Sequence, residues 1–484
     1  MPALVRPSPE ELLPVYQELL PRASVRAWVT ASNVKLYWRL LMPLVILWGF
    51  IFQRLNHDHT CDAAVSHLHS GAAEGLVPAH PVAGPLSRRL TSESTSAYVQ
   101  GRNRLPLSVL QAALRHVLTV LLGWLRAKEA STTWKGHAVR WLDGTTFRLS
   151  PTEAILQEYT QASNQTGTAH WVIVRSLASF CGFASSELSV EDSQALVAYA
   201  EAPTSISESA LVRRVMEQDP ESNCVYVADR NFGTFRCVQI ARACCQHMVV
   251  RLNARTAQLL FRSLHLKGSL RSGADLRVAW VPQPKVQLEP DLPTTPVEGR
   301  LLYVCLQRKG FRPIDLYLFT TLLDPQLYPL EDLVTLYGLR WEVEINYRHI
   351  KTTLEMDEFN VKSPDLFRKE LAAGLLTYNL VCALMAKAAL KANLAPTQLS
   401  FSRCYRRLRD WLVHGVPGWV IAQGDIEDYM LDRLAKCTLP HQPNKVAHEP
   451  RRVRRRPAVF PALKGSRQAA RQRVLQNLAG KPKS

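Results

Sequence analysis

The stretch Ala138-Val139-Arg140-Trp141-Leu142-Asp143-Gly144-Thr145-Thr146 marks the point where the chain changes from a helical to a strand-like pattern. Residues 1–130, which precede it, read as helices. Residues 40–55 form an apolar segment typical of a buried helix, and residues 105–125 repeat apolar side chains at intervals of three and four. The run 138–142 is instead short, favours a strand and is closed by the acid Asp143.

Further strand-like runs follow this stretch along the chain. They lie at residues 171–177, 181–190, 224–228 and 248–252, with a helical pattern at 206–216 between the second and the third. Together with residues 138–142, these runs predict three strands, a helix and then two more strands.

Residues 253–328 interrupt this rhythm. Five prolines fall within fifteen residues, and strand-like runs at 276–281, 301–307 and 314–323 flank them, which predicts a β-rich insertion. Helical patterns resume at 330–354 and 367–394. The sequence therefore predicts an α/β protein divided into a helical region (1–130), the first part of a core (131–252), the insertion (253–328), the remainder of the core (329–395) and a C-terminal helical region with a basic tail (396–484).

The charge of the chain favours a polyanionic partner. Its 59 Lys and Arg residues against 41 Asp and Glu residues give a formal charge of +18. Residues 448–484 hold eleven basic residues and one acid, so this tail contributes 11 − 1 = +10; such a block is either a solubilising end or a nucleic-acid arm. DNA or RNA is the expected partner.

Several other classes of protein are disfavoured. The ten cysteines are scattered without a Cys-x-x-Cys pair, which fits a reducing cytoplasm. The apolar run 40–52 is shorter than the roughly 20 residues of a membrane helix, so no membrane partner is expected. The sequence contains neither a Walker-type glycine-rich run nor a Gly-x-Ser-x-Gly elbow, so neither a nucleotide cofactor nor a serine nucleophile is predicted.

One predicted helix carries most of the polar chemistry. Tyr337, Arg340, Glu344 and Lys351 fall within about 60° of one another if residues 330–354 form one straight helix that turns about 100° per residue. Such a stripe suits a site where a carboxylate binds a metal while cations and a hydroxyl contact phosphates. The alternative is a solvated face with an ion pair between Arg340 and Glu344, which are four residues apart.

Two more acids close apolar runs. Asp143 follows residues 138–142, and Asp229 follows Val225-Tyr226-Val227-Ala228. Either one alone is more often a turn or cap residue. With Glu344, however, two neighbouring strands and a helix could bring three carboxylates together, and such a group binds hard cations. Two Mg²⁺ ions held in this way support in-line phosphoryl transfer.

These residues resemble a known family. Asp143-Gly144-Thr145, Asp229-Arg230 and the helix Tyr337-x2-Arg340-x3-Glu344-x6-Lys351 are similar to the three signatures of the DDE transposases of bacterial insertion sequences, in the branch with a Y-R-E-K signature. The helix matches in residue type and spacing. The second signature departs from the family, because Asn231 and Phe232 stand where Gly and Tyr are more frequent.

The resemblance implies a fold, a reaction and a site. The fold would be a ribonuclease-H-like core with a β-rich insertion, preceded by a helical domain that binds the ends of the element. Asp143, Asp229 and Glu344 would be the catalytic residues and the ligands of two Mg²⁺ ions, for which Mn²⁺ could substitute. The residues implied to contact DNA are Tyr337, Arg340, Lys351 and Arg230.

The implied reaction is cutting at the ends of the insertion sequence, followed by joining of the 3′-hydroxyl ends to target DNA. A homodimer would bridge two ends, in the bacterial cytoplasm and at the nucleoid. Some relatives form a DNA hairpin and stack a Trp from the insertion, but Trp280 reads better as a core residue.

Two alternatives stand beside this interpretation. The chain could be a non-catalytic DNA-binding protein derived from a transposable element, which occupies the ends and represses. A cluster of histidines and one cysteine could suggest zinc, but its spacing fits a polar loop better than a zinc finger. This cluster consists of His57, His59, Cys61, His67 and His69.

Overall fold

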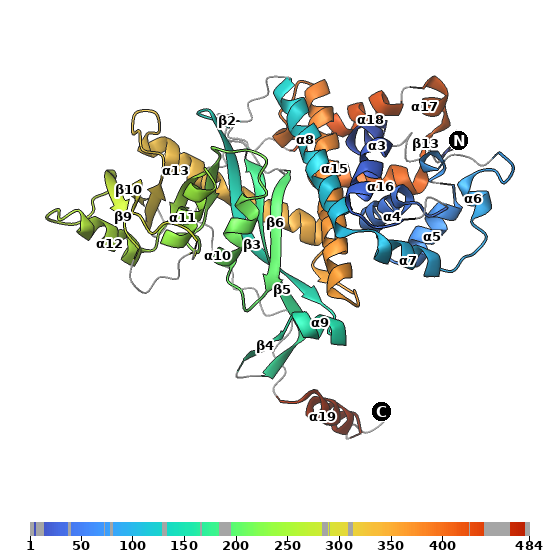
Figure 1. Ribbon diagram of the computed structural model, residues 1–484, viewed down its shortest axis with the longest axis horizontal. Helices are drawn as coiled ribbons and strands as arrows, with labels where there is room; N and C mark the ends of the chain where they lie inside the picture. The colour runs from blue at the N-terminus through green and yellow to red at the C-terminus, as the bar shows by residue number, and fades with distance from the viewer. Residues whose placement is uncertain are drawn as a thin grey trace.

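The computed structural model describes most of the chain. The described residues are 4–5, 14–36, 40–71, 73–77, 81–127, 133–164, 167–182, 195–282, 289, 291–307, 313–424, 426–439 and 465–479. They form a mixed α/β protein in which one large sheet lies between a β-rich end and a helical end (Figure 1).

The centre of the sheet has the predicted order of strands. β3 (His137–Leu149), β5 (Gly167–Gly182) and β6 (Leu196–Pro203) are antiparallel neighbours, and β7 (Val225–Ala228) and β8 (His247–Arg251) continue the sheet in parallel from the other side of β3. The third strand was expected at 181–190 but is β6; β5 ends at Gly182, and residues 183–190 lie outside the described residues.

Helices cover both faces of the sheet at its central strand, β7. Every residue of β7 is buried, as expected for a parallel strand covered on both faces. α10 (Glu208–Met216), at the position of the predicted helix, and α11 (Phe235–Ala243) pack together, and each also contacts the sheet. The two short strands β2 (Thr133–Trp134) and β12 (Glu358–Phe359) pair with β3, and β4 (Gln161–Asn164) pairs with β5, after α9 (Glu153–Glu158).

The strands expected between residues 253 and 328 are present. β9 (Ala274–Trp280), β10 (Val297–Leu306) and β11 (Ile314–Thr320) form an antiparallel group that joins the main sheet where β11 pairs with β8. The helix α12 (Ala254–Ser263), which precedes them, was not predicted from the sequence. Trp280 is a core residue as predicted: it is 6% exposed and meets the Phe319 ring edge to face at 4.8 Å.

The segment expected as one helix over 330–354 is not continuous. α13 (Leu330–Gly338) is followed by a 3₁₀ turn, η2 (Leu339–Trp341), then by α14 (Glu342–Arg348) and a π-helical turn, η3 (His349–Thr353). Turns of 3₁₀ and π type change the angle between successive residues, and π turns are frequent at functional sites. The prediction of a single straight stripe was therefore wrong.

The helical end is organised around α15 (Pro364–Lys391), which begins with Ser363 as N-cap and Pro364 in the first turn. Asn379 on α15 exchanges two 2.8 Å hydrogen bonds with the backbone of Leu196 on β6, which fixes the helix to the sheet. α15 also packs against four helices of the helical end. These are α4 (Pro43–Leu55), α8 (Leu107–Ala127), α16 (Phe401–His414) and α18 (Ile426–Ala435).

Shorter elements complete the helical end. They are β1 (Leu4–Val5), α2 (Pro14–Leu19), α3 (Arg22–Ala31), α5 (Cys61–His69), η1 (Glu74–Leu76), α6 (Leu86–Arg89), α7 (Ser96–Arg104), η4 (Pro396–Gln398), β13 (Val416–Pro417) and α17 (Gly418–Gln423). α19 (Arg467–Ala479) lies apart from the helical end, below β4 in Figure 1. Glu370 of α15 binds Arg54 of α4 and Arg102 of α7, and all three side chains are buried. This ion pair network joins the N-terminal helices to α15.

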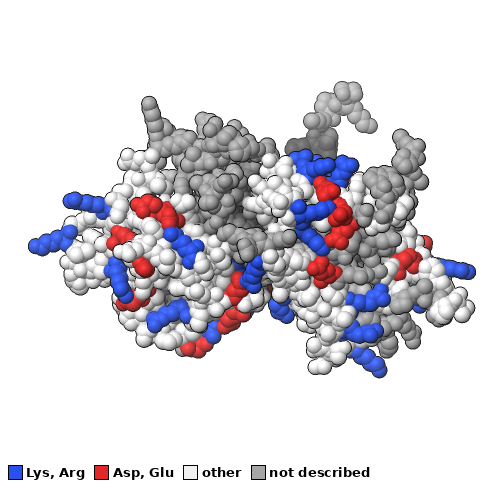
Figure 2. Space-filling view, turned by 90° about the horizontal axis from the view of Figure 1, so that it is seen from above, with Lys and Arg blue, Asp and Glu red and all other residues white. Residues whose placement is uncertain are grey.

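Two described helices, α8 and α15, are long and apolar enough to cross a membrane by length and composition alone. α15 is buried along most of its length, and α8 packs its apolar side against it, so both have the character of core helices. On the face seen in Figure 2, Lys and Arg side chains are interspersed with acids instead of forming one continuous patch. Most of the basic tail, including residues 451–457, lies outside the described residues.

Candidate active site

The two aspartates lie side by side on neighbouring strands. β3 and β7 run in parallel, and Leu142 pairs with Ala228, so Asp143 is the next residue on β3 and Asp229 is the first residue after β7. Adjacent strands are about 4.8 Å apart, which places the two residues within reach of one ion. Asp143 does not close its strand as expected: β3 continues to Leu149, and it is β7 that ends here.

Asp143 is held in a desolvated position. Its Oδ1 accepts a 2.9 Å hydrogen bond from the Gly144 N–H, and its Oδ2 lies 4.0 Å from Nη1 of Arg340. Burial raises the pKa of Asp143 to about 6; Arg340 and the Gly144 N–H oppose the shift, while the charges of Asp229 and Glu208 add to it. The carboxyl group therefore lies among other acids, with a cation at a longer distance.

Asp229 begins a tight turn. Its Oδ1 accepts a 2.8 Å hydrogen bond from the Asn231 N–H, and its carbonyl accepts one from the Phe232 N–H at 3.2 Å. Each aspartate thus has one oxygen fixed by the backbone, and its second oxygen receives no hydrogen bond from the described part of the chain. Two such oxygens are suitable ligands for a hard cation.

Glu344 is exposed on α14, and a neighbour on that helix contacts Asp143. The Tyr347 hydroxyl donates a 2.6 Å hydrogen bond to the carbonyl oxygen of Asp143. Tyr347 follows Glu344 by three residues on α14, so this bond brings the helix that carries Glu344 close to Asp143. Asp143 and Asp229 thus lie together at the end of β7, whereas the place of Glu344 beside them stays a prediction.

Tyr337 and Arg340 are more buried than the predicted DNA contacts would suggest. They are 7% and 6% exposed, and the Arg340 guanidinium lies 6.0 Å from the centre of the Tyr337 ring. Burial raises the pKa of the Tyr337 hydroxyl, with Arg340 and Arg251 opposing the shift. In this structure both side chains border the carboxylates.

Lys351 and Arg230 lie at different edges of the site. Lys351 is in the π-helical turn, with its Nζ 3.1 Å from Asp357 Oδ1 and 5.6 Å from the centre of the Phe147 ring. Phe147 follows Asp143 by four residues on β3 and shares its face, so Lys351 lies farther along the same strand. Arg230 is exposed in the turn after Asp229.

Sequence reasoning missed Glu208, the first residue of α10. Burial raises the pKa of its carboxyl group; the Arg175 charge opposes the shift and the Asp229 charge adds to it. An acid in the first turn of a helix is common for electrostatic reasons, so the sequence carried no signal that would separate Glu208 from an ordinary helix acid.

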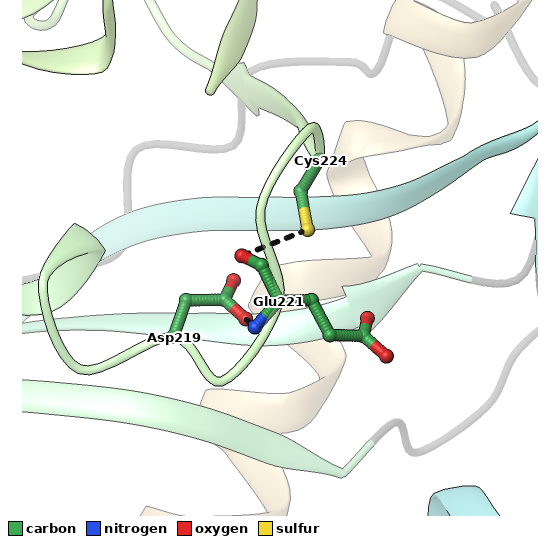
Figure 3. A group of neighbouring side chains, drawn as sticks. All are labelled: Asp219, Glu221 and Cys224. Carbon is green, nitrogen blue, oxygen red and sulfur yellow. Dashed lines mark hydrogen bonds between the residues drawn. The ribbon is translucent and has the colours of Figure 1, made fainter. Parts of the chain in front are cut away.

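A second acidic group lies at the other end of β7. Asp219, Glu221 and Cys224 offer ligand atoms within 4.8 Å of one another (Figure 3). Arg140, 2% exposed, already neutralises this group: its Nε lies 2.7 Å from Asp219 and its Nη2 lies 2.6 Å from Glu221. Because a cation already occupies these oxygens, we assign the group to a buried ion pair rather than to a metal site.

The histidine cluster does not assemble. His57 and His59 lie 3.3 and 3.9 Å from Glu355, whereas the His67 ring stacks on Phe52 at 3.6 Å. The segment was predicted as a polar loop, but Cys61, His67 and His69 lie on the helix α5 (Cys61–His69), so that prediction was wrong for residues 61–69.

The transposase InsG of insertion sequence element IS4 from Escherichia coli (strain K12) is 34% identical over 151 residues, which are 30% of this chain and 33% of that relative. The chain thus matches about a third of the relative's length. A cryo-EM structure of the piggyBac transposase synaptic complex with hairpin DNA aligns over 90% of this chain and 87% of that chain, with a TM-score of 0.39 and 9% identity, a likeness too distant to carry an argument.

The family model described as the transposase DDE domain matches residues 134–380. This range is just over half of the 484 residues and contains Asp143, Asp229 and Glu344. The chain therefore belongs to the transposase DDE domain family.

Proposed function

We propose that the protein is the DNA transposase of an insertion sequence, which cuts at the ends of its element and joins the 3′-hydroxyl ends to target DNA. The observation that carries this proposal is the parallel register of β3 and β7. It brings Asp143 beside Asp229, and the hydrogen bond from Tyr347 to Asp143, on the helix that carries Glu344, supports Glu344 as the third carboxylate.

The three residues fit the metal that the reaction needs. Asp143 and Asp229 each keep one carboxylate oxygen without a hydrogen bond from the described chain, and oxygen ligands suit Mg²⁺ and Mn²⁺. Two bound Mg²⁺ ions would supply activation of the attacking oxygen and stabilisation of the leaving one. Asp143, Asp229 and Glu344 would hold these ions.

The residues around the carboxylates would position the DNA. Arg230 is exposed beside Asp229 and is suited to a phosphate contact as the structure stands. Tyr337 and Arg340 are buried beside the two aspartates, so we propose that they contact the phosphate at which the bond is broken. Lys351, which lies farther along β3, would contact the DNA strand at another phosphate. In the first step water attacks that phosphate at which the bond is broken and a 3′-hydroxyl leaves. In the second step the same hydroxyl attacks a phosphate of target DNA and displaces a 3′-oxygen of the target strand.

The finer classification also belongs to this proposal. The order β6-β5-β3-β7-β8 supports a ribonuclease-H-like core, and Tyr337, Arg340, Glu344 and Lys351 support the Y-R-E-K branch. We propose the domain limits given above: an end-binding region at 1–130, a core at 131–252 and 329–395, an insertion at 253–328, and a C-terminal region at 396–484. A homodimer would bring two ends together in the cytoplasm.

The test is strand cleavage and joining on DNA that carries the native flanks of the gene, with Mg²⁺ or Mn²⁺ against EDTA. The wild-type protein should cut at the flanks and form joined products. Glu344→Gln should bind the same DNA but neither cut nor join. Glu331→Gln, an equal change at an exposed acid in the first turn of α13, is the control and should retain both reactions.

Three other outcomes would contradict the proposal. Cutting without joining would indicate a nuclease of the same fold. Binding by the wild-type protein without any cutting would favour the end-binding repressor. Full activity in Glu344→Gln would remove Glu344 from the site.

A further inference from the structure

Glu208 lies against the backbone of β3, immediately after Asp143. A Cβ atom built on Gly144 would be 2.6 Å from Glu208 Cδ and 2.7 Å from its Oε1. Real Cβ atoms essentially never come so close to a neighbour, so the glycine leaves the space in which the Glu208 carboxylate lies. Side chains at Asp143 and Gly144 point to opposite faces of the sheet, so Glu208 approaches from the face opposite to α14.

Arg175 holds this arrangement in place. Its Nη1 donates a 3.1 Å hydrogen bond to the carbonyl oxygen of Thr204 and another to that of Ile206, which fixes the turn between β6 and α10. Its Nε lies 3.9 Å from Glu208 Oε1, too far for a hydrogen bond. Arg175 thus fixes the turn that leads into α10, but it contributes to the Glu208 carboxylate only an ion pair at longer range.

The Glu208 carboxylate is left available for a ligand. Its side chain is 28% exposed, and it accepts no hydrogen bond from any residue that the structure describes. The charge of Asp229 repels it, as does that of Asp143. A half-buried carboxylate normally obtains hydrogen bonds or a cation. On the α10 side of the sheet, Arg175 is the one nearby cation described for the three acids Asp143, Asp229 and Glu208, and it does not hydrogen-bond Glu208.

We propose that Glu208 is a fourth carboxylate of the metal site, binding a metal ion directly or through one of its waters, on the opposite side from Glu344. This proposal rests on the proposed function, because it requires that Asp143 and Asp229 hold the metal. β7 ends at Ala228, so among the described residues no strand pairs with β3 at Gly144 on that edge. The Glu208 carboxylate can therefore reach the metal site past this uncovered edge of β3.

The test is Mn²⁺ binding to the full-length protein, measured by the loss of the free Mn²⁺ signal in electron paramagnetic resonance. Glu208→Gln keeps the size of the side chain and removes its charge. We expect it to weaken Mn²⁺ binding about tenfold, within the range found when groups that support metal ligands are changed. Cleavage at low Mg²⁺ should fall with it and recover when the Mg²⁺ concentration is raised.

Two further variants make the result decisive. Glu217→Gln, at the residue that follows α10 and pairs with half-buried Arg213, should bind Mn²⁺ as the wild type does. Asp143→Asn should lose most of the binding. If Asp143→Asn weakens binding and Glu208→Gln, folded with an unchanged unfolding midpoint, does not, Glu208 is not part of the site and the inference is overturned while the proposed function stands. If Asp143→Asn itself binds as the wild type does, the metal site of the proposed function fails as well.

Discussion

Asp143 should make the metal-free protein less stable, and replacing it should reverse this effect. Burial among other acids raises its pKa from the ordinary 3.8 to about 6. The folded protein therefore binds this proton more tightly than the unfolded chain does, so stability is lost as pH rises from about 4 to about 6 and stays lost above that. Asp143→Asn removes the charge and keeps an oxygen that can accept the Gly144 N–H.

The size of the effect follows from the shift in pKa. Two units at about 1.4 kcal/mol each correspond to about 3 kcal/mol at pH 8 and to about 1.6 kcal/mol at pH 5, where the folded carboxyl is already largely protonated. In EDTA, Asp143→Asn should thus exceed the wild type in unfolding free energy by these amounts. Added Mn²⁺ should stabilise the wild type and not the variant, because a ligand that binds the folded state stabilises it.

The assay is urea unfolding followed by tryptophan fluorescence at pH 5 and pH 8. Asp410→Asn, at an acid that is 52% exposed on α16, serves as the control and should change the unfolding free energy by less than about 0.5 kcal/mol at either pH. Two results would refute the argument that Asp143 is a desolvated acid that a bound cation would stabilise. One is that Asp143→Asn is less stable than the wild type in EDTA at pH 8; the other is that its effect on the unfolding free energy does not change with pH.

Two further predictions concern the helical end. Glu370→Ala should lower the unfolding free energy by about 3–5 kcal/mol, because it leaves Arg54 and Arg102 buried without their carboxylate; Glu370→Gln should cost less in the same urea experiment, and equal losses would argue against a charge effect. Gly101→Ala should cost about 1–3 kcal/mol, because its Cβ would lie 2.4 Å from Cδ1 of Ile46 on α4. Ile46→Val removes that methyl group, so the double variant should recover part of the loss, and simple addition of the two losses would count against the predicted clash.

The parts of the fold that depend on local pattern were predicted from the sequence. The buried run Val225–Ala228 has the continuous apolar character of a parallel strand, and the structure confirms it as β7. The strands around the five prolines and the helices at 107–127 and 364–391 were likewise recognisable, because their patterns extend over many residues.

The parts that depend on tertiary contacts were not. Periodicity does not show that β3 continues past Asp143, since Gly144, Thr145 and Thr146 are residues that a turn would also use. A straight helix was assumed across Gly338, where the structure has a 3₁₀ turn, and the π turn at His349–Thr353 left no mark in the pattern of apolar residues.

The candidate site divides in the same way. Asp143, Asp229 and Glu344 were predicted because apparent strand ends, spacing and a family resemblance all pointed to them. The approach of Glu208 to Gly144 and the hydrogen bond from Tyr347 to Asp143 join residues 64 and 204 positions apart, which no local pattern can reveal.

The central claim is that Asp143, Asp229 and Glu344 hold the metal ions that cut and join DNA. The most direct measurement is an anomalous difference map from crystals of the protein bound to its DNA end in the presence of Mn²⁺. We predict anomalous peaks between these three carboxylates. Peaks at Asp219, Glu221 and Cys224 alone, or none near the two aspartates while the DNA is bound, would contradict the claim.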